Sequence, residues 1–102
     1  MLKMERTCDA LRCDVYFEGE LVGIMEGVNL IQWFIKNKYS YRGSFSKFMA
    51  FDQEFEKIGT IFDIVFRGKK VIVRNVRIQW INAFGENGTF TASNLEYFDG
   101  NV

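Results

Sequence analysis

The chain has 102 residues, of which 13 are basic and 13 acidic, so its formal net charge is zero. This balance argues against a dedicated nucleic-acid binder, which would present a basic surface. Hydrophobic residues make up 48% of the chain, which suffices for one core in a single domain over residues 1–102. No apolar run reaches 18 residues, so no membrane span is expected, and the first residues lack the apolar stretch of a signal peptide. We therefore expect the chain to mature in the cytosol.

The residue pattern in the N-terminal part of the chain predicts strands. Residues 1–10 are expected to form a flexible or interface arm. Residues 11–17 alternate between apolar and polar side chains, as a half-buried strand does. Residues 18–20, Glu-Gly-Glu, predict a turn, and residues 21–25 a short returning strand. Residues 28–41 fit a strand or a helix, but their β-branched and aromatic side chains favour one long strand.

Residues 44–58, SFSKFMAFDQEFEKI, predict the one amphipathic helix of the chain. Phe48, Phe55 and Ile58 recur at helical spacing and would form an apolar stripe facing the core. A serine near the start can cap this helix, and Gly59 stands where a left-handed residue commonly ends one.

The centre of the chain, TIFDIVFRGKKVIVRNVRIQWIN, predicts two antiparallel strands joined by a loop. Its apolar side chains alternate with polar ones, as in a strand with one buried face. A three-residue loop at Gly68–Lys70 would place Phe62 opposite Val76. The same loop would place Phe66 opposite Ile72, so the apolar residues of both strands would share one face.

A second hairpin is predicted at Asn87-Gly88, because a type I′ turn needs positive φ at both central residues and these residue types adopt it readily. This turn would pair Trp80 with Leu95. Three strands would then agree on one apolar face against the helix. That face would comprise Phe62, Phe66, Ile72, Val76, Ile78, Trp80, Leu95 and Tyr97, with Ile78 opposite Tyr97.

Residues that perform catalysis or bind metals are scarce. There is no histidine, and a metal site at Cys8 and Cys13 would need two more soft ligands. In the cytosol we expect two reduced thiols, and a disulfide between them is the alternative. Asp52 and Glu56 would lie one helical turn apart and could act as an acid/base pair, but a solvated helix face explains them with fewer assumptions. No glycine-rich phosphate loop precedes a helix. We expect no catalytic residue, no cofactor and no metal, and the sequence does not favour an enzyme.

The strongest local charge feature is a cluster of basic residues in the central hairpin: Arg67, Lys69, Lys70, Arg74 and Arg77. Residues 60–82 hold these five positive charges and one negative charge, Asp63, for a net of +4, so the rest of the neutral chain carries −4. Such asymmetry could steer one copy onto another. A solvated tip that keeps a strand edge soluble and a platform for single-stranded nucleic acid are the alternatives. Our hypothesis is an assembly interface.

A short hairpin (VYFEGELVG), a long strand, an amphipathic helix (FSKFMAFDQEFEKIG), and a hairpin with a closing strand (TFTASNLEYF) follow one another over residues 11–98. This order resembles the tail-tube proteins of long-tailed bacteriophages and related injection-system tube subunits. The resemblance implies a small β domain whose sheet joins those of its neighbours in rings that stack into a hollow tube. It also implies a virion protein synthesised in the host cytoplasm, with copies of itself and other virion proteins as partners and DNA as passing cargo.

We therefore expect a mostly β (α+β) fold, an antiparallel β-sandwich or barrel of about six to seven strands with one flanking amphipathic helix. The expected function is that of a structural, self-assembling, tail-tube-like subunit. Long strands without proline and a split charge would suit head-to-tail assembly. Two alternatives stay open, a small β-barrel that binds a ligand and another phage tail or baseplate completion protein.

Overall fold

The computed structural model describes residues 2–97, and only the backbone of residues 2–8, Ile35 and Arg67. All of its strands belong to one antiparallel sheet, which confirms the predicted mostly β, antiparallel class. The sheet has eight strand segments, whereas about six or seven were expected. They are β1 (Leu2–Phe17), β2 (Glu20–Ile35), β3 (Lys38–Phe45), β4 (Lys47–Ala50), β5 (Ile61–Phe66), β6 (Val71–Ile81), β7 (Gly88–Ala92) and β8 (Asn94–Tyr97), with a 3₁₀ turn η1 (Arg67–Lys69) between β5 and β6.

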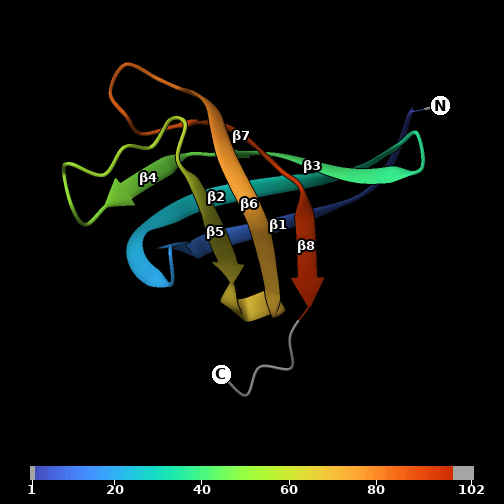
Figure 1. Ribbon diagram of the computed structural model, residues 1–102, viewed down its shortest axis with the longest axis horizontal. Helices are drawn as coiled ribbons and strands as arrows, with labels where there is room; N and C mark the ends of the chain where they lie inside the picture. The colour runs from blue at the N-terminus through green and yellow to red at the C-terminus, as the bar shows by residue number, and fades with distance from the viewer. Residues whose placement is uncertain (1, 98–102) are drawn as a thin grey trace.

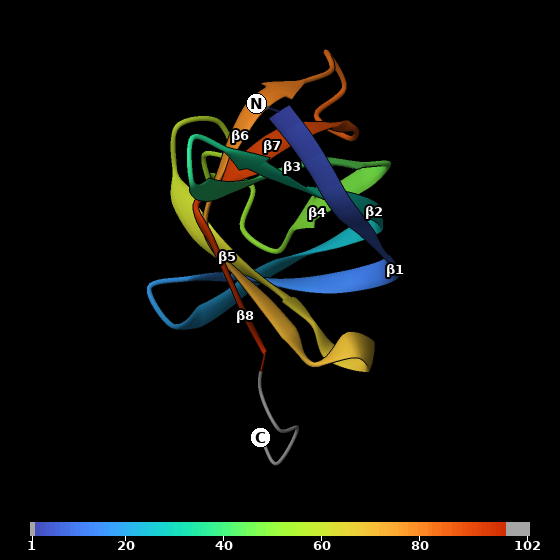
Figure 2. The ribbon, with the colours of Figure 1, turned by 90° about the vertical axis from the view of Figure 1, so that its right-hand side faces the viewer.

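The sheet closes on itself (Figures 1 and 2). The pairing runs β1–β5–β6–β7–β3–β2, and β2 pairs in turn with β1, so the strands form a ring. β4 continues the line of β3 along β2, and β8 continues the line of β7 along β6. Of the two architectures expected, this ring corresponds to the barrel.

The first bend of the barrel wall crosses three strands at one level. The pairing of β1 with β2 skips Leu11 and Gly27, and Gly27 has a φ of +60°. Ser46 separates β3 from β4, and its backbone N–H and hydroxyl both donate to the carbonyl oxygen of Glu26 at 2.9 Å. A Cβ on Gly27 would clash with Ser46 Oγ, so the bend requires glycine there.

The second bend crosses β5, β6 and the junction of β7 with β8. Asn75 forms a bulge in β6 with a φ of +55°, and Ser93 separates β7 from β8. Such irregularities let a strand turn a corner and close a small barrel. The wall therefore bends at two lines of irregular residues rather than curving evenly.

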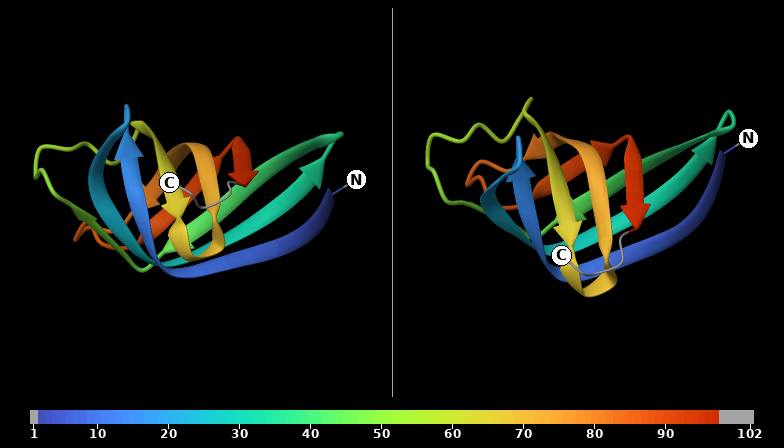
Figure 3. Two further views of the ribbon diagram at one scale, coloured as in Figure 1. Left: turned by 90° about the horizontal axis from the view of Figure 1, so that it is seen from below. Right: turned by 60° about the horizontal axis from the view of Figure 1, so that its bottom comes forward.

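The ends of β1, β2 and β3 continue as an arm past Tyr41, the last residue of β3 that pairs with β7 (Figure 3). The arm comprises residues 2–4, 33–35 and 38–40. The segment expected to be a flexible or interface arm is thus, from Leu2 onward, part of β1. The predicted long strand over 28–41 is wrong in one respect. It is interrupted by a two-residue turn at Lys36–Asn37, where φ is +51° and +62°, so that β2 returns as β3.

The predicted flanking helix over residues 44–58 is wrong. Its first part is the end of β3 and the whole of β4, and residues 51–60 form a loop. Phe45 and Phe48 are both buried because the break at Ser46 shifts the strand alternation by one position. Two buried residues three apart therefore imitate helical spacing. Phe55 then reaches back from the loop, with its ring centroid 6.3 Å from that of Phe48.

The predicted register of the central hairpin is right at one pair and wrong at another. Phe62 does lie opposite Val76, but Phe66 lies opposite Val71 instead of Ile72. The connection at residues 67–70 is one residue longer than predicted. The bulge at Asn75 then takes up the additional residue before Val76 is reached.

The predicted Asn87-Gly88 turn is also wrong. Neither residue has a positive φ, and the connection is the loop 82–87, which Asn82 closes by donating its N–H to the Asn87 carbonyl oxygen at 2.8 Å. Gly88 already belongs to β7, opposite Ile81. The pairing also shifts between Ile78 and Trp80, which turns Trp80 outward.

The core differs from the predicted face accordingly. Trp80 is 55% exposed, Tyr97 is exposed opposite Val71, and Leu95 is half-buried opposite Val73. The buried apolar residues come from all strands of the ring and from β4: Cys13, Val15, Met25, Val28, Leu30, Tyr41, Phe45, Phe48, Phe62, Ile64, Phe66, Val71, Val73, Val76, Ile78, Phe90 and Ala92.

Candidate assembly interface

From Leu2 to Arg12, one edge of β1 has no partner strand within residues 2–97. Its one side pairs with β2 over nearly its whole length, whereas its other side pairs with β5 only at Asp14–Tyr16. At about 3.4 Å per residue, the stretch from Leu2 to Arg12 spans roughly 35 Å. Unpaired N–H and C=O groups in such a row are a template for a strand of another chain. The chain has no proline to block that pairing.

The end of the barrel formed by the loops 51–60 and 82–87 is apolar. The two loops lie side by side, since Lys57 Nζ donates to the Gly85 carbonyl oxygen at 3.2 Å and Ile58 bridges to Ile78. Several large apolar side chains are exposed in these loops and on the strands next to them: Met49, Phe51, Ile58, Ile61, Trp80 and Phe84. Clustered exposed apolar side chains of this kind mark interaction sites on many proteins.

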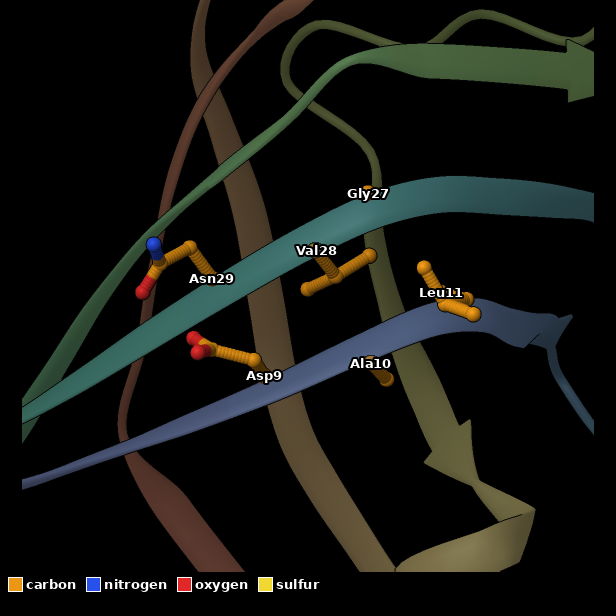
Figure 4. Close-up of a pocket in the computed structure, with 6 residues that line it drawn as sticks. All are labelled: Asp9, Ala10, Leu11, Gly27, Val28 and Asn29. Carbon is orange, nitrogen blue, oxygen red and sulfur yellow. The ribbon is translucent and has the colours of Figure 1, made fainter.

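A hollow of about 300 Å³ lies on the outer wall of β1 and β2, at the first bend (Figure 4). Its lining residues are Asp9, Ala10, Leu11, Gly27, Val28 and Asn29. Asp9 and Asn29 face each other across the two strands, and Leu11 stands beside them with 89% of its surface exposed. Gly27 leaves bare backbone in the lining, so the hollow follows directly from the bend.

The structure separates the predicted basic cluster into parts. Arg74 donates from Nη1 to Asp63 Oδ2 at 2.8 Å and from Nε to Glu96 Oε2 at 3.1 Å. The hydrogen bond to Asp63, followed by that to Glu96, raises the pKa of Arg74 above its ordinary value. Its charge is therefore largely offset by two carboxylates within its own chain, although exposed ion pairs of this kind contribute little to stability.

The other members of the cluster lie at two places. Lys69 and Lys70 are exposed together at the connection of β5 with β6, where Lys70 has a φ of +55°. Arg77 is exposed further along β6, opposite Thr91 of β7. The side chain of Arg67 lies outside the described part of the chain. A localised positive tip thus rests on Lys69 and Lys70.

The residues considered for chemistry do not converge. Asp52 and Glu56 are exposed in the loop 51–60, and Asp52 Oδ1 accepts the N–H of Glu54 at 2.9 Å in a local turn. Cys13 is buried in the core, and the side chain of Cys8 is among those not described. Among the described residues, no group of three or more His, Cys, Asp or Glu side chains could hold a metal ion. No helix within residues 2–97 has the length and apolarity needed to cross a membrane.

Sequence reasoning missed the free edge of β1, the hollow at Gly27 and the exposure of Phe84. Gly27 stands between the predicted strands 21–25 and 28–41, but its neighbours in space could not be inferred from that position. Phe84 lies in the loop 82–87 directly before Gly85, and a position next to a turn-forming glycine could have indicated its exposure. In comparisons with protein-family models, curated proteins and solved structures, the chain matches none of them.

Proposed function

We propose that the protein is a structural subunit that assembles with copies of itself into rings or a tube, of the tail-tube type. The observation that supports this function is the unpaired edge of β1 from Leu2 to Arg12. A strand from a neighbouring copy would satisfy the backbone groups along that edge and extend the sheet from one subunit to the next. In this proposal the assembly belongs to a virion, and DNA passes through it as cargo.

Head-to-tail assembly needs a second, different edge on each subunit. β4 pairs with β2 alone, and β8 pairs with β6 alone, so both have a free side within the described residues. Either could receive β1 of the neighbouring copy. The arm carries the β1 edge beyond the barrel, which allows it to reach a neighbour without the two barrels overlapping (Figure 3).

Hydrogen–deuterium exchange on the purified full chain tests this function together with analytical ultracentrifugation and negative-stain microscopy. In the dilute monomer, roughly half of the β1 amides should face solvent, since alternate residues of an edge strand point outward. At concentrations that give rings or tubes, those amides should become protected. Amides of β6, which pairs on both sides, are the internal control and should be protected in both states.

Two outcomes would contradict the proposal. The first is a chain that stays monomeric at every concentration reached. The second is an assembly in which β1 amides exchange as fast as in the monomer. Assembly that occurs only after another tail protein is added would favour the completion-protein alternative.

A further inference from the structure

We infer that Phe84 of one copy inserts into the hollow on the outer wall of β1 and β2 of the next copy, as a second head-to-tail contact. This inference rests on the proposed self-assembly, and it identifies which surfaces meet besides the strand edge. The two most exposed large apolar side chains among the described residues belong to these two surfaces. Leu11, in the hollow, is 89% exposed, and Phe84 is 86% exposed.

The hollow has the size and lining to receive an aromatic ring. Its volume is about 300 Å³, and it is open to solvent, so a side chain of a neighbouring copy can reach it. Leu11 contributes exposed apolar surface, and Gly27 contributes backbone without a side chain, whereas the side chains of Val28 and Ala10 pack toward the core. An aromatic ring placed here would cover Leu11 and remove the apolar surface of both groups from water.

Charges next to each surface are complementary. Asp9 lines the hollow, and Arg12, which is also exposed, follows Leu11 on β1. Phe84 is flanked by Lys57, whose Nζ reaches the Gly85 carbonyl oxygen at 3.2 Å, and by the exposed Glu86. Each surface therefore carries one acidic and one basic side chain. One orientation pairs Glu86 with Arg12 and Lys57 with Asp9, and this choice of orientation gives the contact specificity.

The two surfaces lie on different parts of the molecule. The loop 82–87 projects at one end of the barrel, and the bend of β1 and β2 lies away from it in both Figure 1 and Figure 2. Phe84 and the hollow of the same chain are therefore not in contact. A projecting apolar group that fits a hollow elsewhere on an identical molecule produces a heterologous contact, which propagates into rings or filaments.

The test measures self-association of the full chain by sedimentation velocity. Phe84→Ser should weaken association at least tenfold, whereas Phe51→Ser, which removes another exposed phenylalanine from the neighbouring loop, should leave it unchanged. Far-ultraviolet circular dichroism and the melting temperature verify that both variants fold. Assembly of Phe84→Ser at the wild-type concentration would overturn the inference.

A charge exchange tests the orientation. Glu86→Arg and Arg12→Glu should each weaken association, and the double variant should recover most of the wild-type association. Failure of the double variant to recover would contradict the proposed pairing. A wild-type chain that remains monomeric would overturn the proposed function and this contact together. Wild-type assembly that Phe84→Ser does not affect would overturn this contact alone.

Discussion

Asn75 Nδ2 donates a hydrogen bond to Ser93 Oγ at 2.9 Å, which joins the bulge in β6 to the break between β7 and β8. The backbone N–H of Asn75 also points to Asp63 Oδ1, at 3.3 Å. Three neighbouring strands are therefore held together by side-chain contacts at the level where each of them is irregular. This relationship makes the second bend a defined corner that is specified by a few polar residues.

The first prediction concerns this corner. Asn75→Val should lower the free energy of unfolding by about 1–3 kcal/mol, because a β-branched residue tolerates the φ of +55° poorly. Asn75→Gly should cost less, since glycine adopts that conformation without strain. Chemical denaturation measures both. Ser93→Ala separates the hydrogen bond from the backbone effect, and equal stability of the valine and glycine variants would show that the backbone is not strained.

The second prediction contrasts two aromatic residues. Phe66 is 1% exposed inside the barrel, and its truncation to alanine should cost about 3–5 kcal/mol. Trp80 is 55% exposed on the outside, so Trp80→Ala should cost about 1 kcal/mol or less. Equilibrium denaturation of the two variants under the same conditions gives the comparison. A Trp80 variant as unstable as the Phe66 variant would mean that the shift between Ile78 and Trp80 is absent in solution.

The third prediction concerns glycines. A Cβ on Gly88 would clash with the Trp80 carbonyl oxygen and lie 2.9 Å from Phe45 Cζ. Gly88→Ala should therefore destabilise the fold by about 1–3 kcal/mol, as overpacking does. Gly68 has no atom within 4 Å of such a Cβ, so Gly68→Ala serves as the matched control and should be nearly neutral. Equal melting temperatures for the two variants would contradict the close approach of β6 and β7.

The sequence was sufficient to predict the fold class because a strand with one buried face imposes a period of two on its side chains. It was not sufficient to predict bulges. Phe62 lies opposite Val76 as expected, but only because a longer turn and the bulge at Asn75 offset each other. The partners that hold the bulge, Asp63 and Ser93, are distant in sequence. A local pattern therefore gave one correct pair and several incorrect ones.

The same dependence on residues that are distant in sequence explains why the predicted helix is wrong and why the predicted basic cluster is divided. Phe45 and Phe48 have helical spacing because the break at Ser46 turns both inward, and this break depends on Gly27 in the adjacent strand. The basic residues could be counted from the sequence, but the neutralisation of Arg74 by Asp63 could not. A free strand edge is a property of the topology as a whole. It could be identified only after the ring of pairings was known.

The last prediction concerns the positive tip at Lys69 and Lys70, both of which are exposed. If this tip meets an acidic surface of a neighbour, Lys69→Glu with Lys70→Glu should block higher-order assembly while the monomer stays folded. Salt should weaken wild-type assembly in the same way, because the screening length falls from about 8 Å at physiological ionic strength to about 3 Å at 1 M. Circular dichroism reports the fold, and light scattering reports the assembly.

Lys36→Glu with Lys38→Glu changes the net charge equally at the other hairpin tip, which is also exposed, and should leave assembly intact. If both double variants assemble as the wild type does, the tip is a solvated edge. If both fail to assemble, net charge is responsible, and Lys69 and Lys70 have no specific role.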